Sequence, residues 1–97
     1  MSTTTEIDYI TVASLGNAAD FGDMTTSAHC NMGSCSNGSR GVLAGGNTAG
    51  TEYVDMHYIT FSTLGNSSDF GDILLAARMP FSCSNGTRGV FCGGYAD

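Results

Sequence analysis

"LGNAADFGD" at residues 15–23 and "LGNSSDFGD" at residues 64–72 are two versions of one stretch within a chain of 97 residues. The likeness continues on both sides of this stretch. "YITVASLGNAADFGDM" (9–24) matches "YITFSTLGNSSDFGDI" (58–73) at an offset of 49 positions. The stretch is therefore part of a larger repeated segment, and the rest of that segment decides how its glycines and aspartates are interpreted.

A second block repeats in the same order along the chain. "SCSNGSRGVLAGG" (34–46) matches "SCSNGTRGVFCGG" (82–94) at an offset of 48 positions. Nearly the whole chain therefore consists of two copies of one unit, which we place at residues 6–54 and 55–97 of a single repeat domain. A period near 50 residues is typical of β-propeller blades, and it is too long for ankyrin or tetratricopeptide units.

The segments of this unit predict β-structure. "DYITVAS" (8–14) and "HYITFST" (57–63) are rich in the β-branched and aromatic residues that favour strands. Asn-Gly dipeptides at 37–38 and 85–86 lie between two apolar runs, which is a strong hairpin signal. Asp20–Asp23 predicts a turn next to a fourth short strand. No segment predicts a convincing amphipathic helix, so we expect an all-β fold.

The order of these pieces resembles the blades of kelch-type β-propellers. "AARMPFSCSNGTRGVFCGG" (76–94) contains a hairpin and an apolar strand that ends in Gly-Gly, and "GGNTAGTEYVDMHYITF" (45–61) continues into tyrosine-bearing strands. The tryptophan of the family's outer strand is missing, with Phe21 and Phe70 as the nearest substitutes. The repeated stretch also resembles uncharacterised repeat arrays in phage and marine metagenomic proteins.

The resemblance implies four-stranded propeller-type blades, two per chain, with split blades at the ends. Residues 6–26 would form an outer strand pair, residues 27–75 a complete blade, and residues 76–95 an inner strand pair. Half-blades expose unpaired strand edges, and two units cannot close a ring. We therefore expect a self-assembling homo-oligomer in which neighbouring chains complete the split blades. A trimer of six blades is favoured over a tetramer. If the rotation from each chain to the next does not close a ring, the chains form a filament instead.

Charge and composition exclude several classes of partner. The chain has 3 basic and 9 acidic residues and a formal net charge of −6, with no lysine. It therefore lacks a basic surface for nucleic acid or for a membrane. The first residues contain neither the basic nor the apolar part of a secretory signal. We expect cytoplasmic synthesis, and a virion or released particle could then carry the product outside the cell.

The repeated aspartates and asparagines suit two different roles. Their oxygens recur at a spacing of three and could ligate calcium, which prefers six to eight oxygen ligands. However, the EF-hand pattern and its bidentate glutamate are absent. We favour turn formation through side-chain hydrogen bonds to the backbone, and we expect no metal and no cofactor. The weak calcium candidates are Asn17, Asp20, Asp23, Asn66, Asp69 and Asp72.

Repeated arginines and tyrosines are the remaining candidates for binding. Arg40 and Arg88 follow equivalent hairpin turns, where each could bind an anion or a sugar. We favour ion pairs between these arginines and the repeated aspartates, because the chain has few cations and many carboxylates. The equivalent residues Tyr9 and Tyr58 could stack on sugars. A lectin with sugar sites at blade junctions is therefore the alternative to a structural module.

An enzyme is not expected, because neither repeat contains a nucleophile with a base at an informative spacing. His29 and His57 are not equivalent in the repeat, so we do not expect a repeated metal site. The cysteines match no zinc or disulfide framework, and we expect small buried thiols. They are Cys30, Cys35, Cys83 and Cys92.

Three Asn-x-Ser/Thr sequons begin at Asn37, Asn66 and Asn85. Such sequons accept glycans only in secreted eukaryotic proteins. Because no secretory signal is visible, we interpret them as turn residues.

Overall fold

The computed structural model describes residues 4–25, 30–48, 50–78 and 80–95. Within these ranges the chain is all-β, as predicted, with strands and no helix. The strands are β1 (Glu6–Tyr9), β2 (Ala19–Asp23), β3 (Gly33–Ser36), β4 (Arg40–Ala44), β5 (Asn47–Thr48), β6 (Thr51–Glu52), β7 (Asp55–Thr60), β8 (Ser68–Asp72), β9 (Phe81–Ser84) and β10 (Gly89–Cys92).

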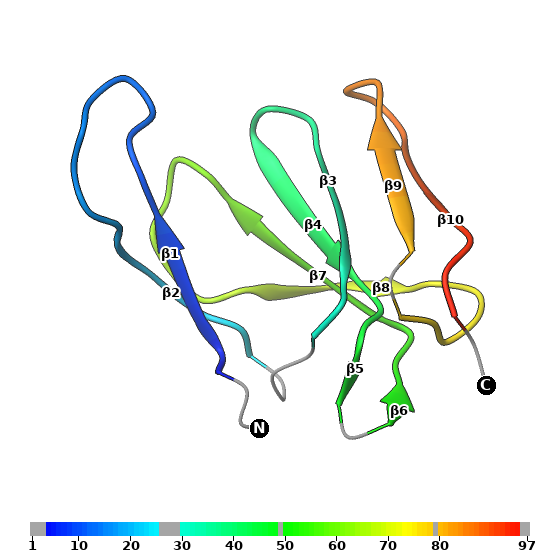
Figure 1. Cartoon of the computed structure of the whole chain (residues 1–97). Coiled ribbons are helices and arrows are strands. Elements are labelled where there is room, and N and C mark those ends of the chain that lie inside the picture. Colours follow the sequence, from blue (N-terminus) through cyan, green and yellow to red (C-terminus); the bar gives the residue numbers. More distant parts are fainter. Residues whose placement is uncertain (1–3, 26–29, 49, 79, 96–97) are drawn as a thin grey trace.

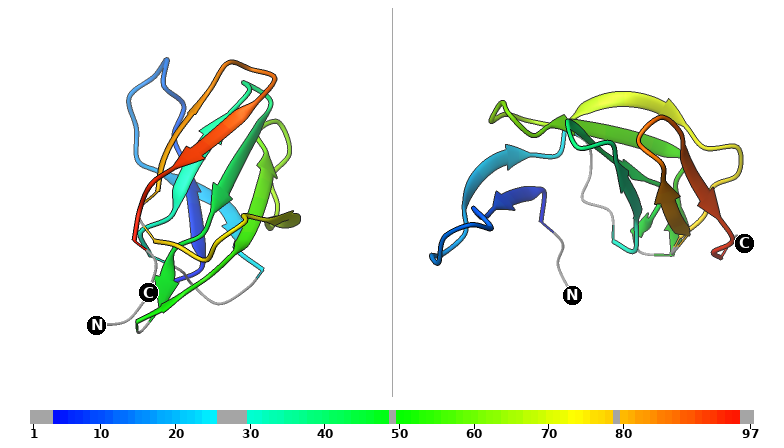
Figure 2. Two further views of the ribbon diagram at one scale, coloured as in Figure 1. Left: turned by 90° about the vertical axis from the view of Figure 1, so that its right-hand side faces the viewer. Right: turned by 90° about the horizontal axis from the view of Figure 1, so that it is seen from above.

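The strands form one four-stranded sheet and three two-stranded sheets, all antiparallel. The central sheet has the order β3-β4-β7-β8. We call the β1–β2 sheet the outer pair and the β9–β10 sheet the inner pair. Figure 1 shows the outer pair at one side of the central sheet and the inner pair at the other, and the view from above in Figure 2 agrees. The strand pairing thus follows the expected division into an outer pair, a four-stranded sheet and an inner pair.

The two Asn-Gly hairpins form as predicted. In the β3–β4 hairpin, Asn37 Oδ1 accepts hydrogen bonds from the backbone N–H groups of Ser39 (2.9 Å) and Arg40 (2.8 Å). Gly38 has a φ of 91°, which an L side chain rarely adopts. The β9–β10 hairpin repeats these bonds with Asn85 as the acceptor. The same local chemistry therefore builds both hairpins.

Two strands end earlier than predicted. The apolar segments 8–14 and 57–63 were both expected to be strands, but β1 ends at Tyr9 and β7 ends at Thr60. After β7 the chain turns through a hydrogen bond from Thr63 N–H to the Thr60 carbonyl (3.1 Å). The β-branched residues that follow each strand therefore lie in a loop.

The prediction of a turn at Asp20–Asp23 is wrong, because these residues form most of β2. They pair with β1, and the register shifts between Ile7 and Asp8, so that Phe21 has no directly opposite partner. Such an irregularity lets one strand hold an extra residue without ending the pairing. The repeated stretch is consequently a loop followed by an outer strand.

The described part of the chain buries few apolar side chains. These are Phe21, Met24, Ala44 and Ala77. The exposed large apolar residues are Tyr9, Ile10, Val12, Leu15, Phe61, Leu64, Phe70, Leu74, Leu75, Phe81, Val90 and Tyr95. Small domains bury a modest share of their surface, and clustered exposed apolar residues mark interaction surfaces. The isolated chain thus leaves much apolar surface uncovered.

Candidate functional site

The strands at the ends of each sheet have an edge with no strand partner among the described residues, and we call those of β1 and β10 the open edges. β1 pairs only with β2, and β10 pairs only with β9. Figure 1 shows these two strands at opposite sides of the molecule. The unpaired N–H and C=O groups of such an edge can pair with a strand of another chain.

The open edges are counterparts of two strands that already pair inside the central sheet. By its position in the repeat, β10 corresponds to β4, with Gly-Val in common, and β1 corresponds to the first part of β7, with the tyrosine in common. β4 and β7 pair in an antiparallel register that runs from Arg40 opposite Thr60 to Ala44 opposite Met56. The open edges of β10 and β1 could therefore pair with each other, in two different copies of the chain, as β4 and β7 pair within one chain.

The residues at the open edges are more exposed than their counterparts. Ala44 in β4 is fully buried, whereas Cys92 at the same position of β10 is exposed. Tyr58 in β7 is half-buried, whereas Tyr9 in β1 is 39% exposed. β4 and β7 cover each other's edges in the central sheet, whereas β10 and β1 lack this neighbour in the described part of the chain.

The loop between β7 and β8 links the central sheet to the outer pair. We call residues 64–67 of this loop the clasp. Gly65 N–H donates to the Phe21 carbonyl (2.8 Å), and Ser67 N–H donates to the Asp23 carbonyl (2.9 Å). The clasp therefore runs along the outer edge of β2 and satisfies backbone acceptors there.

Two side chains of the clasp complete this contact. Asn66 Oδ1 accepts a hydrogen bond from Asp23 N–H (3.0 Å), and Ser67 Oγ accepts one from Thr25 N–H (3.0 Å). Ser67 is only 3% exposed. Asn66 thus binds the neighbouring strand β2 through its side-chain oxygen.

A glycine at the contact makes the close approach possible. A Cβ atom built on Gly22 would lie 2.1 Å from the Gly65 carbonyl oxygen, so a larger residue would collide with the clasp. Gly71 is the counterpart of Gly22 and has a similar φ, 150° against 156°. Its nearest atom is Met56 Cε at 3.7 Å. A Cβ atom at Gly71 would therefore meet only an ordinary contact and no counterpart of the clasp within the described residues.

The inner pair contacts the central sheet through equivalent serines. The Ser82 hydroxyl donates to the Ser34 carbonyl, and Ser34 N–H donates to Ser82 Oγ (3.0 Å). The hydroxyl of Ser34 itself has no hydrogen-bond partner within the described ranges. This contact uses the backbone N–H and carbonyl of Ser34 and the hydroxyl of Ser82. Each serine keeps the other set of groups for an equivalent contact with a further repeat.

The thiols are free, and their burial is uneven. Cys30 and Cys35 are half-buried, whereas Cys83 and Cys92 are exposed, so the expectation of burial is wrong for the latter two. Burial raises the pKa of the Cys35 thiol, and the nearby Cys83 raises it further. A Cβ atom at Gly89 would lie 2.5 Å from Cys35 Sγ, which shows how closely β10 approaches this side chain.

Arg40 lies on an aromatic ring and not against an aspartate. Its guanidinium carbon is 4.3 Å from the centre of the Tyr58 ring, within the range of a cation–π interaction. Phe70 meets the same ring edge-on, with centroids 6.1 Å apart. Neither Arg40 nor Arg88 forms an ion pair in the described part of the chain. One face of Tyr58 is thus already occupied by Arg40.

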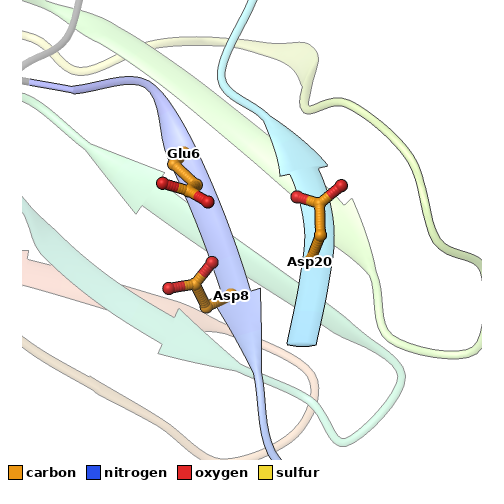
Figure 3. Close-up of side chains that lie close together, drawn as sticks. All are labelled: Glu6, Asp8 and Asp20. Atoms are coloured by element: carbon orange, nitrogen blue, oxygen red, sulfur yellow. The ribbon is translucent and has the colours of Figure 1, made fainter. Parts of the chain in front are cut away.

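An exposed acidic cluster lies on the outer pair. Carboxylate oxygens of Glu6, Asp8 and Asp20 lie within 4.8 Å of one another, and Figure 3 shows the three side chains on the neighbouring strands β1 and β2. Asp8 and Asp20 are direct cross-strand partners. Only Asp20 belongs to the predicted calcium set. The other two residues precede the repeated stretch, and only strand pairing brings them to Asp20.

The second repeat does not reproduce this cluster. His57 occupies the position of Asp8, and it is buried, with 2% of its surface exposed. Asp69 is its cross-strand partner in β8. His29, the other histidine, lies outside the described residues. The acidic cluster is therefore a feature of the first copy and not of the repeat.

A cleft separates the central sheet from the inner pair. Its volume is about 420 Å³. Val42, Met56 and Phe70 contribute its apolar wall on the central sheet, and Phe91 contributes from the inner pair. Arg40 and Arg88 also line the cleft. The cleft lies on the side of the central sheet that has no outer pair beside it.

Two further findings complete the description. The described part of the chain contains no helix with the length and apolar character needed to cross a membrane. No protein-family model matches the chain, and no curated protein matches it either.

Proposed function

We propose that this protein is a non-enzymatic structural module that assembles head to tail into an oligomeric β-propeller. In this arrangement β10 of one copy pairs with β1 of the next copy, and the two half-blades become one four-stranded blade. The observation that carries the proposal is the pairing of β4 with β7, because β10 and β1 occupy the equivalent positions of the repeat. The resemblance to phage repeat arrays suggests a virion as the setting.

The register of the contact between copies follows from the β4–β7 register. In the pairs below, the first residue belongs to one copy and the second to the next. They are Arg88 with Thr11, Gly89 with Ile10, Val90 with Tyr9, Phe91 with Asp8, and Cys92 with Ile7. Arg88 then lies beside Tyr9 of the next copy, as Arg40 lies over Tyr58 within the chain. The same attraction between cation and ring would operate at both places.

The exposed apolar surface supports this arrangement. The outer pair of the next copy would lie beside the inner pair and fill the cleft of about 420 Å³. Removing apolar side chains such as Phe70 and Val90 from water favours association. Closing both strand edges also removes the unpaired backbone groups that lead to uncontrolled aggregation.

Each copy would contribute two blades, so a trimer gives a propeller of six blades and a tetramer one of eight. If the rotation between copies does not close a ring, the same contact produces a filament.

Size-exclusion chromatography with light scattering tests the proposal. We expect a mass of about three or four times 10.0 kDa, or a larger polymer. A monomer that persists at concentrations of about 100 μM, where even interfaces of modest affinity assemble, would contradict it. Electron microscopy then distinguishes rings from filaments.

A further inference from the structure

We infer that residues 15–18, in the loop between β1 and β2, are a docking segment for the outer edge of β8 in the preceding copy. The inference rests on the head-to-tail arrangement proposed above and adds a second contact to it. It concerns a different strand edge from the β10–β1 pairing, so the two contacts can be tested separately.

The docking segment is the counterpart of the clasp. Its sequence is Leu-Gly-Asn-Ala, and that of the clasp is Leu-Gly-Asn-Ser. Both loops leave their strands through the same turn, closed by hydrogen bonds from Ser14 to Thr11 (3.2 Å) and from Thr63 to Thr60 (3.1 Å). The clasp forms hydrogen bonds with β2 of the same chain. All four residues of the docking segment are exposed, whereas Ser67 at the end of the clasp is buried.

The edge of β8 matches the edge of β2 that the clasp holds. Both strands pair with their partners in the same way, with an irregularity of register at the same position of the repeat. The rings of Tyr9 and Phe21 meet at 6.1 Å and 78°, and those of Tyr58 and Phe70 meet at the same distance and angle. β8 thus presents the backbone groups and side chains that the clasp recognises on β2.

The edge of β8 is uncovered where the edge of β2 is covered. Phe21 is 7% exposed, whereas Phe70 is 49% exposed. In the described residues no backbone segment lies against Gly71, where a Cβ atom would meet only Met56 Cε at 3.7 Å, whereas the clasp lies against Gly22. Because residue 71 is a glycine, a backbone segment can approach β8 closely at this position, as the clasp approaches β2 at Gly22. Residues 15–18 of the next copy have the sequence that matches the clasp.

The contact between copies can be specified atom by atom from the contact within the chain. Gly16 N–H donates to the Phe70 carbonyl, and Ala18 N–H donates to the Asp72 carbonyl. Asp72 N–H donates to Asn17 Oδ1, as Asp23 N–H donates to Asn66 within the chain. The occupant is therefore a second copy of this chain.

One position makes the docking segment a weaker binder than the clasp. Ser67 Oγ accepts a hydrogen bond from Thr25 N–H (3.0 Å), and Ala18 has no oxygen to accept the equivalent bond from Leu74. The contact between copies thus lacks one of the hydrogen bonds of the contact within the chain. This difference makes the association tunable at a single residue.

Matched substitutions test the inference. Asn17→Ala removes only the bond between copies, so the concentration at half-assembly rises at least about fivefold while the melting temperature of the monomer stays unchanged. Asn66→Ala removes the bond to Asp23 and lowers the melting temperature of the monomer. Ala18→Ser restores the missing acceptor and lowers the concentration at half-assembly about fivefold. Light scattering over a dilution series measures the concentration at half-assembly, and thermal melts of the dilute monomer measure its melting temperature.

The outcomes separate the two proposals. If the wild-type chain assembles but Asn17→Ala and Ala18→Ser both assemble like it, the docking contact is wrong and head-to-tail assembly stands. If the wild-type chain stays monomeric at every concentration, both proposals are wrong. A lower monomer melting temperature for Asn17→Ala, equal to that of Asn66→Ala, would also overturn the docking contact.

Discussion

Ser82 donates its hydroxyl hydrogen to the carbonyl oxygen of Ser34, the residue that occupies the same position one repeat earlier. Ser34 N–H returns a hydrogen bond to Ser82 Oγ (3.0 Å). A contact between a residue and its own counterpart can continue from copy to copy, as in other repeat proteins. In the proposed assembly, the hydroxyl of Ser34 would donate a hydrogen bond to the Ser82 carbonyl of the preceding copy.

The two serines should respond differently to the same substitution. Ser82→Ala removes the hydroxyl used within the chain and should lower the free energy of unfolding by about 1 kcal/mol. Ser34→Ala keeps the backbone groups that Ser82 uses, so the monomer should keep its stability while assembly weakens. Urea denaturation at low concentration and light scattering at high concentration check the pair. An equal loss of monomer stability in both variants would contradict the expectation.

The two glycines on the outer strands form a second matched pair. Gly22→Ala places a methyl group against the Gly65 carbonyl and should destabilise the monomer by about 3 kcal/mol, from collision and from an unfavourable φ. Gly71→Ala meets no such atom and should cost the monomer about 1 kcal/mol through φ alone. It should nevertheless abolish assembly. Urea denaturation and light scattering measure the two effects, and unimpaired assembly of Gly71→Ala would count against contact at this edge.

The acidic cluster should destabilise the outer pair at low salt. Like charges on directly opposite strand positions repel, as Asp8 and Asp20 do. Asp8→Asn should therefore raise the melting temperature by about 3 °C at low ionic strength. The gain should disappear in 1 M salt, where the screening length is about 3 Å. A gain that persists at high salt would show that repulsion is not its cause.

The Cys35 thiol should make stability depend on alkaline pH. Its pKa is raised in the folded chain, so the folded state keeps the thiol proton at pH values where the unfolded state has lost it. The stabilisation is complete below the ordinary thiol pKa and is lost as pH rises through the folded pKa. Thermal melts between about pH 7 and 10 should show a decline that Cys35→Ser reduces. The same slope in both proteins would contradict this assignment.

Local chemistry explains which elements could be predicted from the sequence. The Asn-Gly dipeptides predicted both hairpins because their turns need a positive φ, which Gly38 and Gly86 adopt. The resemblance to kelch-type blades implied the division into an outer pair, a central sheet and an inner pair. The lengths of β1 and β7 could not be predicted, because β-branched residues such as Val12 favour strands but here belong to a loop.

The side-chain contacts of the site could not be predicted, because they depend on which distant strands pair with each other. Arg40 reaches Tyr58 because β4 lies beside β7, whereas charge counting favoured an aspartate. Glu6 and Asp8 join Asp20 because β1 pairs with β2. The role of Asn66 required the position of a strand 43 residues away. The one available signal was the repetition of a glycine at positions 22 and 71.

The register between copies is the central claim, and a disulfide tests it most directly. Antiparallel partner residues have Cα atoms about 4.5–5.5 Å apart, within the span of a disulfide. The test uses Ile7→Cys in a background where Cys30, Cys35 and Cys83 are serine. Its control is Ile10→Cys in the same background, because Ile10 should face Gly89, which offers no thiol.

Mild oxidation followed by non-reducing electrophoresis gives the result. The head-to-tail register predicts a ladder of covalent oligomers for Ile7→Cys, with Cys92 of one copy bonded to position 7 of the next, and monomer for Ile10→Cys. Monomer in both variants, or equal cross-linking in both, would contradict the register and with it the completion of one blade by two chains.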